Sequence, residues 1–145
     1  MNSREFNVAD RAFAAVKLWA SNVEPENFPA SLSSSVASII SIRRDPGLFR
    51  AIDVAVDLLR KGLLSDEDIE AILDGLSALL IETNYEDWRQ GDFRTSTLTY
   101  VRANALRLAR SLRKAGHTNQ TIDDWIKAGE NDPVPEVRFA KDKHD

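Results

Sequence analysis

The clearest helix boundary in this chain lies in Asp132-Pro133-Val134-Pro135-Glu136-Val137-Arg138-Phe139-Ala140. Asp132 has a side chain suited to capping a helix N-terminus, and Pro133 suits the first helical turn. Glu136 would then lie near the positive end of the helix dipole, where an acidic side chain is favoured. An amphipathic segment that contains Trp125 precedes this stretch. The local prediction is therefore a helix, a tight turn and the start of a second helix.

Apolar side chains recur at helical spacing along most of the chain, and no segment alternates as a strand would. The predicted fold is a single all-α domain with six helices and a partial seventh. Asp45, Ser65, Asp92 and Asp132 are the predicted N-caps, because each precedes an apolar-periodic segment. The six helices are expected over residues 7–22, 30–44, 46–61, 66–82, 93–114 and 120–129.

The third of these helices has a broad apolar face and is predicted to be central. Two tryptophans, Trp19 and Trp125, lie on apolar faces and are expected in the core. The second helix is rich in serine, a weak helix former. Its small side chains would be solvent-exposed or would let a neighbouring helix approach closely.

Three of the predicted caps, Asp45, Asp92 and Asp132, are spaced by 47 and 40 residues, and each separates two predicted helices. Two-helix repeats of the HEAT and armadillo type are about 40–47 residues long. The stretch 132–140 resembles the turn between the two helices of a HEAT repeat, where Asp-Pro and a following Val-Arg recur. This resemblance implies a stack of antiparallel helix pairs. In such a stack Asp132 caps the second helix and Arg138 joins a ladder of arginines between repeats. An irregular bundle of six to seven helices is the alternative.

Composition limits the classes of function. The 145 residues fit one domain, and 43% hydrophobic residues suffice for a core. A net charge of −4 disfavours nucleic acid as the main partner, because that affinity comes from basic side chains. The absence of cysteine excludes disulfides, thiolate zinc sites and cysteine nucleophiles. We expect a cytoplasmic protein without a membrane span or a cofactor, since neither a signal-peptide pattern nor a long apolar run is present.

Candidate chemistry is sparse. His117 and His144 lie in a predicted loop and at the tail, and neither has convergent ligands. Carboxylates on two neighbouring helices would suit magnesium-dependent hydrolysis if they met, as the Glu-x-x-Glu pairs of helical pyrophosphohydrolases do. The alternative is ion pairs with Arg50, Arg60 and Lys61 on the same helix face. No metal site is predicted. The carboxylates concerned are Asp53, Asp57, Glu67, Glu70 and Asp74.

Two groups of residues are candidates for binding a partner. The predicted loop with Tyr85, Trp88 and Arg89 combines aromatic and arginine side chains, as interface anchors do. The basic end of the fifth helix could instead contact a protein or a phosphate backbone. Its candidate residues are Arg107, Arg110 and Arg113.

With no nucleophile, metal cluster or phosphate loop in the sequence, a non-catalytic role is the leading hypothesis. We expect a HEAT-like protein–protein interaction module with a protein partner. The short C-terminal edge makes self-association there an additional expectation. Three alternatives stay open: a small acidic inhibitor of the immunity-protein type, a nucleic-acid-binding repeat protein that uses the arginine-rich helix end, and a metal-dependent all-α hydrolase.

Overall fold

The computed structural model describes residues 3–43, 48–82, 95–132 and 135–140. These residues form helices and connecting turns with no strand, so the predicted all-α class is confirmed. A short 3-10 helix, η1 (Pro25–Asn27), connects the first two α-helices. The α-helices are α1 (Ser3–Asn22), α2 (Ala30–Ile42), α3 (Leu48–Arg60), α4 (Asp66–Glu82), α6 (Thr95–Lys114), α7 (Gln120–Glu130) and α8 (Pro135–Arg138).

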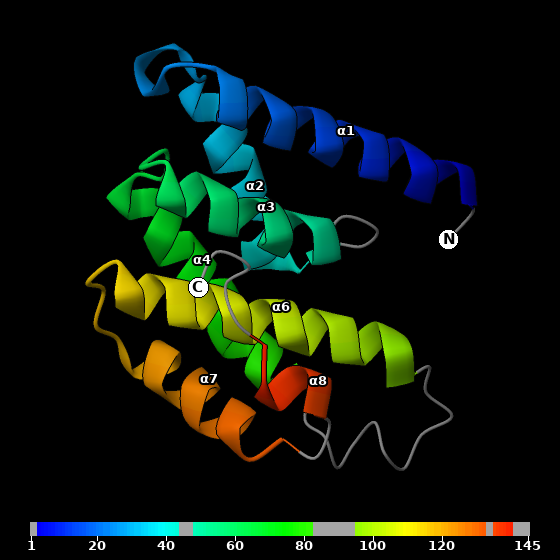
Figure 1. Cartoon of the computed structure of the whole chain (residues 1–145), viewed down its shortest axis with the longest axis vertical. Coiled ribbons are helices and arrows are strands. Elements are labelled where there is room, and N and C mark those ends of the chain that lie inside the picture. The colour runs from blue at the N-terminus through cyan, green and yellow to red at the C-terminus, as the bar shows by residue number, and fades with distance from the viewer. Residues whose placement is uncertain (1–2, 44–47, 83–94, 133–134, 141–145) are drawn as a thin grey trace.

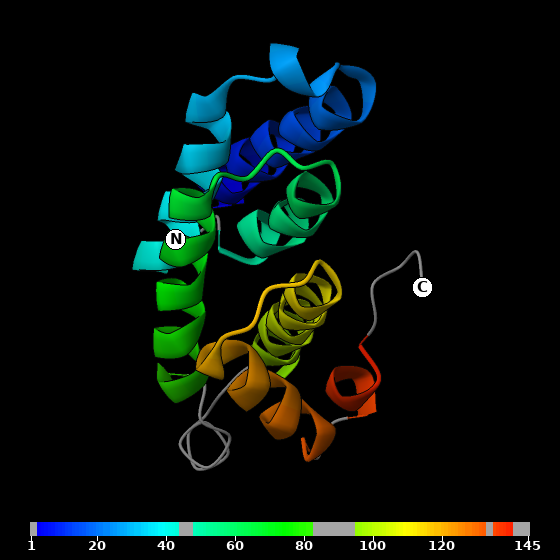
Figure 2. The same ribbon diagram turned by 90° about the vertical axis from the view of Figure 1, so that its left-hand side faces the viewer.

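The helices lie in two layers. In the first layer α1, α3 and α6 are stacked one below another and run in the same direction, and α8 packs against α6 (Figure 1). In the second layer α2 and α4 lie side by side behind them (Figure 2). The helix α7 extends this second layer by touching α4, and it runs opposite to α6, against which it packs. Successive helices therefore alternate between the two layers.

Specific contacts fix the parallel direction of α2 and α4 and join α3 to α6. Between α2 and α4, the Ser34 hydroxyl donates to Asp68 Oδ1 at 3.1 Å, and further along Gly75 lies against the backbone of Ile40. Between α3 and α6, Asn104 Nδ2 donates to the Phe49 carbonyl at 3.4 Å near the start of α3. From the first α2–α4 contact to the second, the residue numbers increase along both helices, as they must in a parallel pair.

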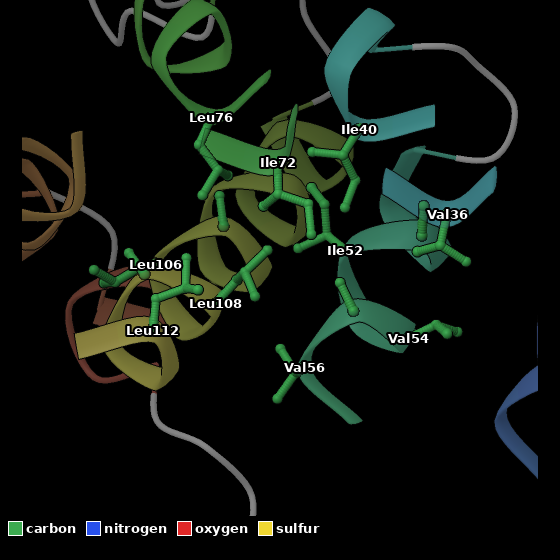
Figure 3. Packing of buried hydrophobic residues seen from close by; sticks show 14 of the residues in the cluster. Val36, Ile40, Ile52, Val54, Val56, Ile72, Leu76, Leu106, Leu108 and Leu112 are labelled. Atoms are coloured by element: carbon green, nitrogen blue, oxygen red, sulfur yellow. The ribbon is translucent and has the colours of Figure 1, made fainter. Parts of the chain in front are cut away.

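The core lies between the two layers and is centred on α3. Side chains from α2, α3, α4 and α6 meet there, as Figure 3 shows for Ile40, Ile52, Ile72 and Leu108. Buried residues occur on almost every side of α3, as expected for a helix that packs against α1 and α6 in its own layer and against α2 in the other. This confirms the predicted central position of the third helix. The buried residues of α3 are Leu48, Ala51, Ile52, Val54, Ala55, Val56 and Leu58.

Gly75 on α4 lies very close to the backbone of α2. A Cβ atom at this position would lie 2.2 Å from the Ile40 carbonyl oxygen and 2.9 Å from Ser41 Cα. Close packing of α2 and α4 therefore depends on a glycine of α4. The serines of α2 are mostly on the solvent side, as the simpler of the two predictions had it. Ser33, in contrast, is buried.

Capping explains where α4 begins. The amide of Asp68 donates to Ser65 Oγ at 3.1 Å, and the amide of Ser65 donates to Asp68 Oδ2 at 3.0 Å. This reciprocal pair is a capping box in which aspartate takes the place usually held by glutamate. Ser65 thus lies where the sequence predicts it. Asp45 and Asp92, the other two caps proposed upstream of Asp132, lie outside the described residues.

The two tryptophans predicted to lie in the core differ in exposure. Trp19 is 44% exposed and packs edge-on against Phe28 with ring centroids 5.8 Å apart, so it covers the core edge and does not enter the core. Trp125 is 1% exposed, as predicted, and its Nε1 donates to the Leu76 carbonyl at 2.7 Å. The structure describes α8 from Pro135, and residues 133–134 lie outside the described residues, so the predicted capping role of Asp132 stays a prediction.

Candidate functional site

Asp132 forms a buried ion pair with Arg102 of α6. Asp132 Oδ2 accepts from Arg102 Nε at 2.8 Å and lies 2.7 Å from Arg102 Nη2. The side chains are only 0% and 6% exposed, respectively. A buried charge is tolerated when a partner of opposite sign and hydrogen bonds satisfy it. The Asp132 carboxylate therefore joins the segment before α8 to α6.

Arginine side chains also hold the C-terminal segment against α6. Arg110 Nη1 donates to the Ala140 carbonyl, and Arg110 Nη2 donates to the Arg138 carbonyl at 3.3 Å. Arg138 Nη1 donates to the Asp132 carbonyl at 3.0 Å, and its guanidinium lies 5.5 Å from the Phe139 ring centre. The Arg138 side chain thus makes its described contacts within the C-terminal segment, with the Asp132 carbonyl and the Phe139 ring. Its predicted place in an arginine ladder stays a prediction.

The other two arginines proposed for partner binding also contact the chain itself. Arg107 Nη1 donates to Asn104 Oδ1 at 2.6 Å on the same helix. Arg113 Nη2 lies 2.7 Å from Asp123 Oδ1, and both side chains are more than half exposed. An exposed pair of this kind is weak, so Arg113 can exchange partners at little cost. Arg110, in contrast, is committed to the C-terminal segment.

The carboxylates of α3 are joined by a lysine from α1. Lys17 Nζ lies 3.1 Å from Asp53 Oδ2 and 3.3 Å from Asp57 Oδ2. These side chains are 14–32% exposed, so the three charges lie in a partly dry seam between α1 and α3. The sequence-based expectation paired these aspartates with cations of their own helix and missed Lys17. Lys17 lies on the apolar helix face that contains Phe13, Val16 and Ala20. A cation in that position indicates a carboxylate partner on the helix packed against this face.

The carboxylates proposed for a magnesium site do not assemble into one. Asp53 and Asp57 face α1, whereas Glu67, Glu70 and Asp74 are exposed on α4. Within the described ranges, no three histidine, aspartate or glutamate side chains come close enough together to hold a metal ion. Tyr85, Trp88 and Arg89, the proposed loop anchors, lie outside the described residues, as does His144.

Charge is divided unevenly between the helices. The helix α6 contains five basic residues and no acidic one, and α4 contains six acidic residues and no basic one. The acidic side chains Glu67, Glu70 and Asp74 face solvent on α4. Three of the basic residues of α6 reach other elements, as described above for Arg102, Arg110 and Arg113. Electrostatically, the two layers therefore differ in sign.

Comparison with known proteins yields no relative: no protein-family model, no curated protein and no solved structure matches this chain. Among the described residues, none of the helices is both long and apolar enough to cross a membrane. Functional inference therefore depends on the geometry of the two layers and of the charged residues.

Proposed function

We propose that this chain is a non-catalytic, cytoplasmic protein–protein interaction module built as a HEAT-like stack of helix pairs. The observation that supports the proposal is the direction of the helices. Within each layer, successive helices run parallel and pack beside the one before, with α1, α3 and α6 in one layer and α2 and α4 in the other. Stacked helix pairs of this kind present extended faces that serve as binding surfaces.

The arrangement of the charged groups supports a binding role over hydrolysis. Lys17 lies between the two α3 carboxylates, and Glu67, Glu70 and Asp74 are exposed on a different helix, α4. Metal-assisted hydrolysis needs carboxylates that converge on one ion. Structural ion pairs and a solvated acidic face account for these residues without a reaction.

Affinity capture from the native cell followed by reconstitution tests the proposal. The tagged chain serves as bait, the tag alone serves as control, and nuclease treatment removes nucleic acid before elution. We expect a protein that is enriched over the control and that forms a saturable complex of fixed stoichiometry when both components are purified. Recovery of nucleic acid alone, or a recovered protein that does not bind the purified chain, would refute the interaction-module proposal.

A further inference from the structure

One face of α1 packs on the molecule and the other is open. The inner face packs against α3 and contains the buried Phe13 and Ala20. In Figure 1, α1 lies at the edge of the first layer, and no other described α-helix lies on its outer side. Four exposed residues follow one another along this outer side, opposite Phe13 and Ala20 on a helix of 3.6 residues per turn. We call them the outer stripe: Arg11, Ala15, Leu18 and Asn22.

The centre of the outer stripe is apolar. Leu18 is 67% exposed, and Trp19 beside it is 44% exposed. In stacked helical arrays, the helix at the end of a stack needs a polar outer surface to stay soluble. A single exposed leucine is ordinary on a protein surface, so a binding role depends on the pattern along the whole stripe.

The spacing of the outer stripe is that of a helix–helix contact. Its residues are separated by four, three and four positions. Alternating steps of three and four keep side chains on one face along the helix, as in the seam of a coiled coil. Within the stripe, the two apolar residues are at the centre and the two polar residues are at the ends. A second helix laid along this face would therefore meet an apolar centre with a polar group on either side.

The outer stripe is complementary to a second copy of itself in the antiparallel direction. A twofold axis between Ala15 and Leu18 would place the small side chain of each copy opposite the large side chain of the other, so that the two helices interdigitate. The same axis would place Arg11 opposite Asn22. Asn22 Nδ2 donates to the Leu18 carbonyl at 2.8 Å, so Asn22 Oδ1 is the atom that would accept from the arginine of the second copy.

We propose that the outer stripe is the interface of a homodimer in which two copies of this chain pair through antiparallel α1 helices. The inference goes beyond the proposed interaction module, because the partner is a second copy and not a different protein. Antiparallel pairing also places the positive end of each helix dipole beside the negative end of the other. Since one helix from each copy forms the contact, the interface is small, and we expect a dissociation constant on the order of 10–100 µM.

A lipid surface fits the outer stripe less well than a second copy does. Helices that lie in a membrane interface present a broad apolar face and carry many lysines or arginines, which attract anionic lipids. The outer stripe has a polar residue at each end and a single large aliphatic side chain. The chain carries a net charge of −4, which anionic lipids repel.

Sedimentation equilibrium over about 5–300 µM protein tests the proposal, in about 150 mM salt to screen the repulsion between two negatively charged copies. The test variants are Leu18→Lys and Ala15→Glu, both at exposed positions. The matched control is Ile81→Lys, which replaces a 73% exposed apolar side chain on α4. We expect the wild-type chain to dimerise. The dissociation constant should rise at least about tenfold in each test variant and change less than about twofold in the control.

A mixture of the two test variants reports the direction of the helices. Antiparallel pairing places the introduced glutamate of one copy opposite the introduced lysine of the other, and the second contact between Ala15 and Leu18 stays native. We expect a one-to-one heterodimer with a dissociation constant within about fivefold of the wild-type value. Circular dichroism establishes that each variant is folded before mixing. Should either variant unfold, Ala15→Lys and Leu18→Glu reverse the charges and give the same readout.

Three results would overturn the proposal. The first is a wild-type chain that stays monomeric throughout this concentration range, and the second is a pair of test variants that dimerise as tightly as the control. The third is the absence of a heterodimer in a mixture of folded variants. If the monomeric wild-type chain binds vesicles of phosphatidylcholine and phosphatidylglycerol and Leu18→Lys does not, the outer stripe is a lipid-binding face. Failure of the homodimer would not refute the interaction module, which is tested with a different protein.

Discussion

At the scale of single residues, the buried ion pair of Arg102 and Asp132 is expected to affect the free energy of unfolding strongly. We predict that Asp132→Ala lowers the free energy of unfolding by about 3–5 kcal/mol, because it removes the Asp132 carboxylate from a buried ion pair with the Arg102 guanidinium. Urea denaturation followed by circular dichroism measures this loss. A loss of only about 1 kcal/mol would match a simple helix cap and would contradict the ion-pair explanation.

The companion variant for this pair is Arg102→Met/Asp132→Leu. Replacing both charges by apolar side chains removes the buried cation together with the carboxylate, so most of the lost stability should return. The sequence favoured a capping role for Asp132 because a neighbouring proline suggested a helix start. It gave no sign of Arg102, which is 30 residues away, because ion pairs between elements distant in the sequence depend on how the helices stack.

Ser33 is a residue at which a polar group opposes folding. It is 1% exposed, and its hydroxyl has no hydrogen-bond partner among the described residues. We predict that Ser33→Ala raises the free energy of unfolding by about 1 kcal/mol or more, since a buried unsatisfied group costs about 1–3 kcal/mol. Ser38→Ala, on the exposed face of the same helix, controls for helix propensity. Equal effects at both positions, measured by thermal unfolding, would show that burial of the hydroxyl carries no cost.

At the scale of elements, the packing of α2 on α4 depends on Gly75. Alanine is the better helix former by about 1 kcal/mol, yet its Cβ would meet the backbone of Ile40 and Ser41. Overpacking costs about 1–3 kcal/mol, and a clash with backbone lies at or above the upper end. We predict a net loss of about 2 kcal/mol in the free energy of unfolding for Gly75→Ala. Ser77→Ala, exposed on the same helix, should be neutral or slightly stabilising, and an equal response at both sites in chemical denaturation would argue against the close approach.

Most of the helices were predictable from the sequence, and the predictions that differ from the structure do so for local reasons. Ser65 and the acids after it placed the start of α4 correctly, because capping is encoded by neighbouring residues. For α8 the described part begins at Pro135, and both Pro133 and Pro135 suit a first turn, so the predicted start near Pro133 stays a prediction. Trp19 lies at the edge of the apolar stripe of α1, where periodicity does not settle whether a large side chain enters the core.

At the scale of the whole molecule, the sequence predicted the all-α class but not the arrangement of charges between layers. The acidic run of α4 and the basic run of α6 are visible in the sequence. Which of these side chains face solvent, which reach a neighbouring helix and which meet at the ends of α1, α3 and α6 depends on stacking.

Stacking also predicts how stability is distributed along the molecule. The helix α3 packs against α1, α2 and α6, whereas α1 packs mainly against α3. In stacked arrays a terminal helix lacks one neighbour and opens more readily than an internal one. We predict that amides of α1 exchange with deuterium about tenfold faster than those of α3, as measured by native-state exchange and mass spectrometry.

Lys17→Met should accelerate exchange in α1 with little change in α6, because it removes the cation between Asp53 and Asp57. Equal protection of α1 and α3 would mean that the chain opens as one cooperative unit, and an equal effect of Lys17→Met on every helix would mean that the α1–α3 seam is not an independent boundary.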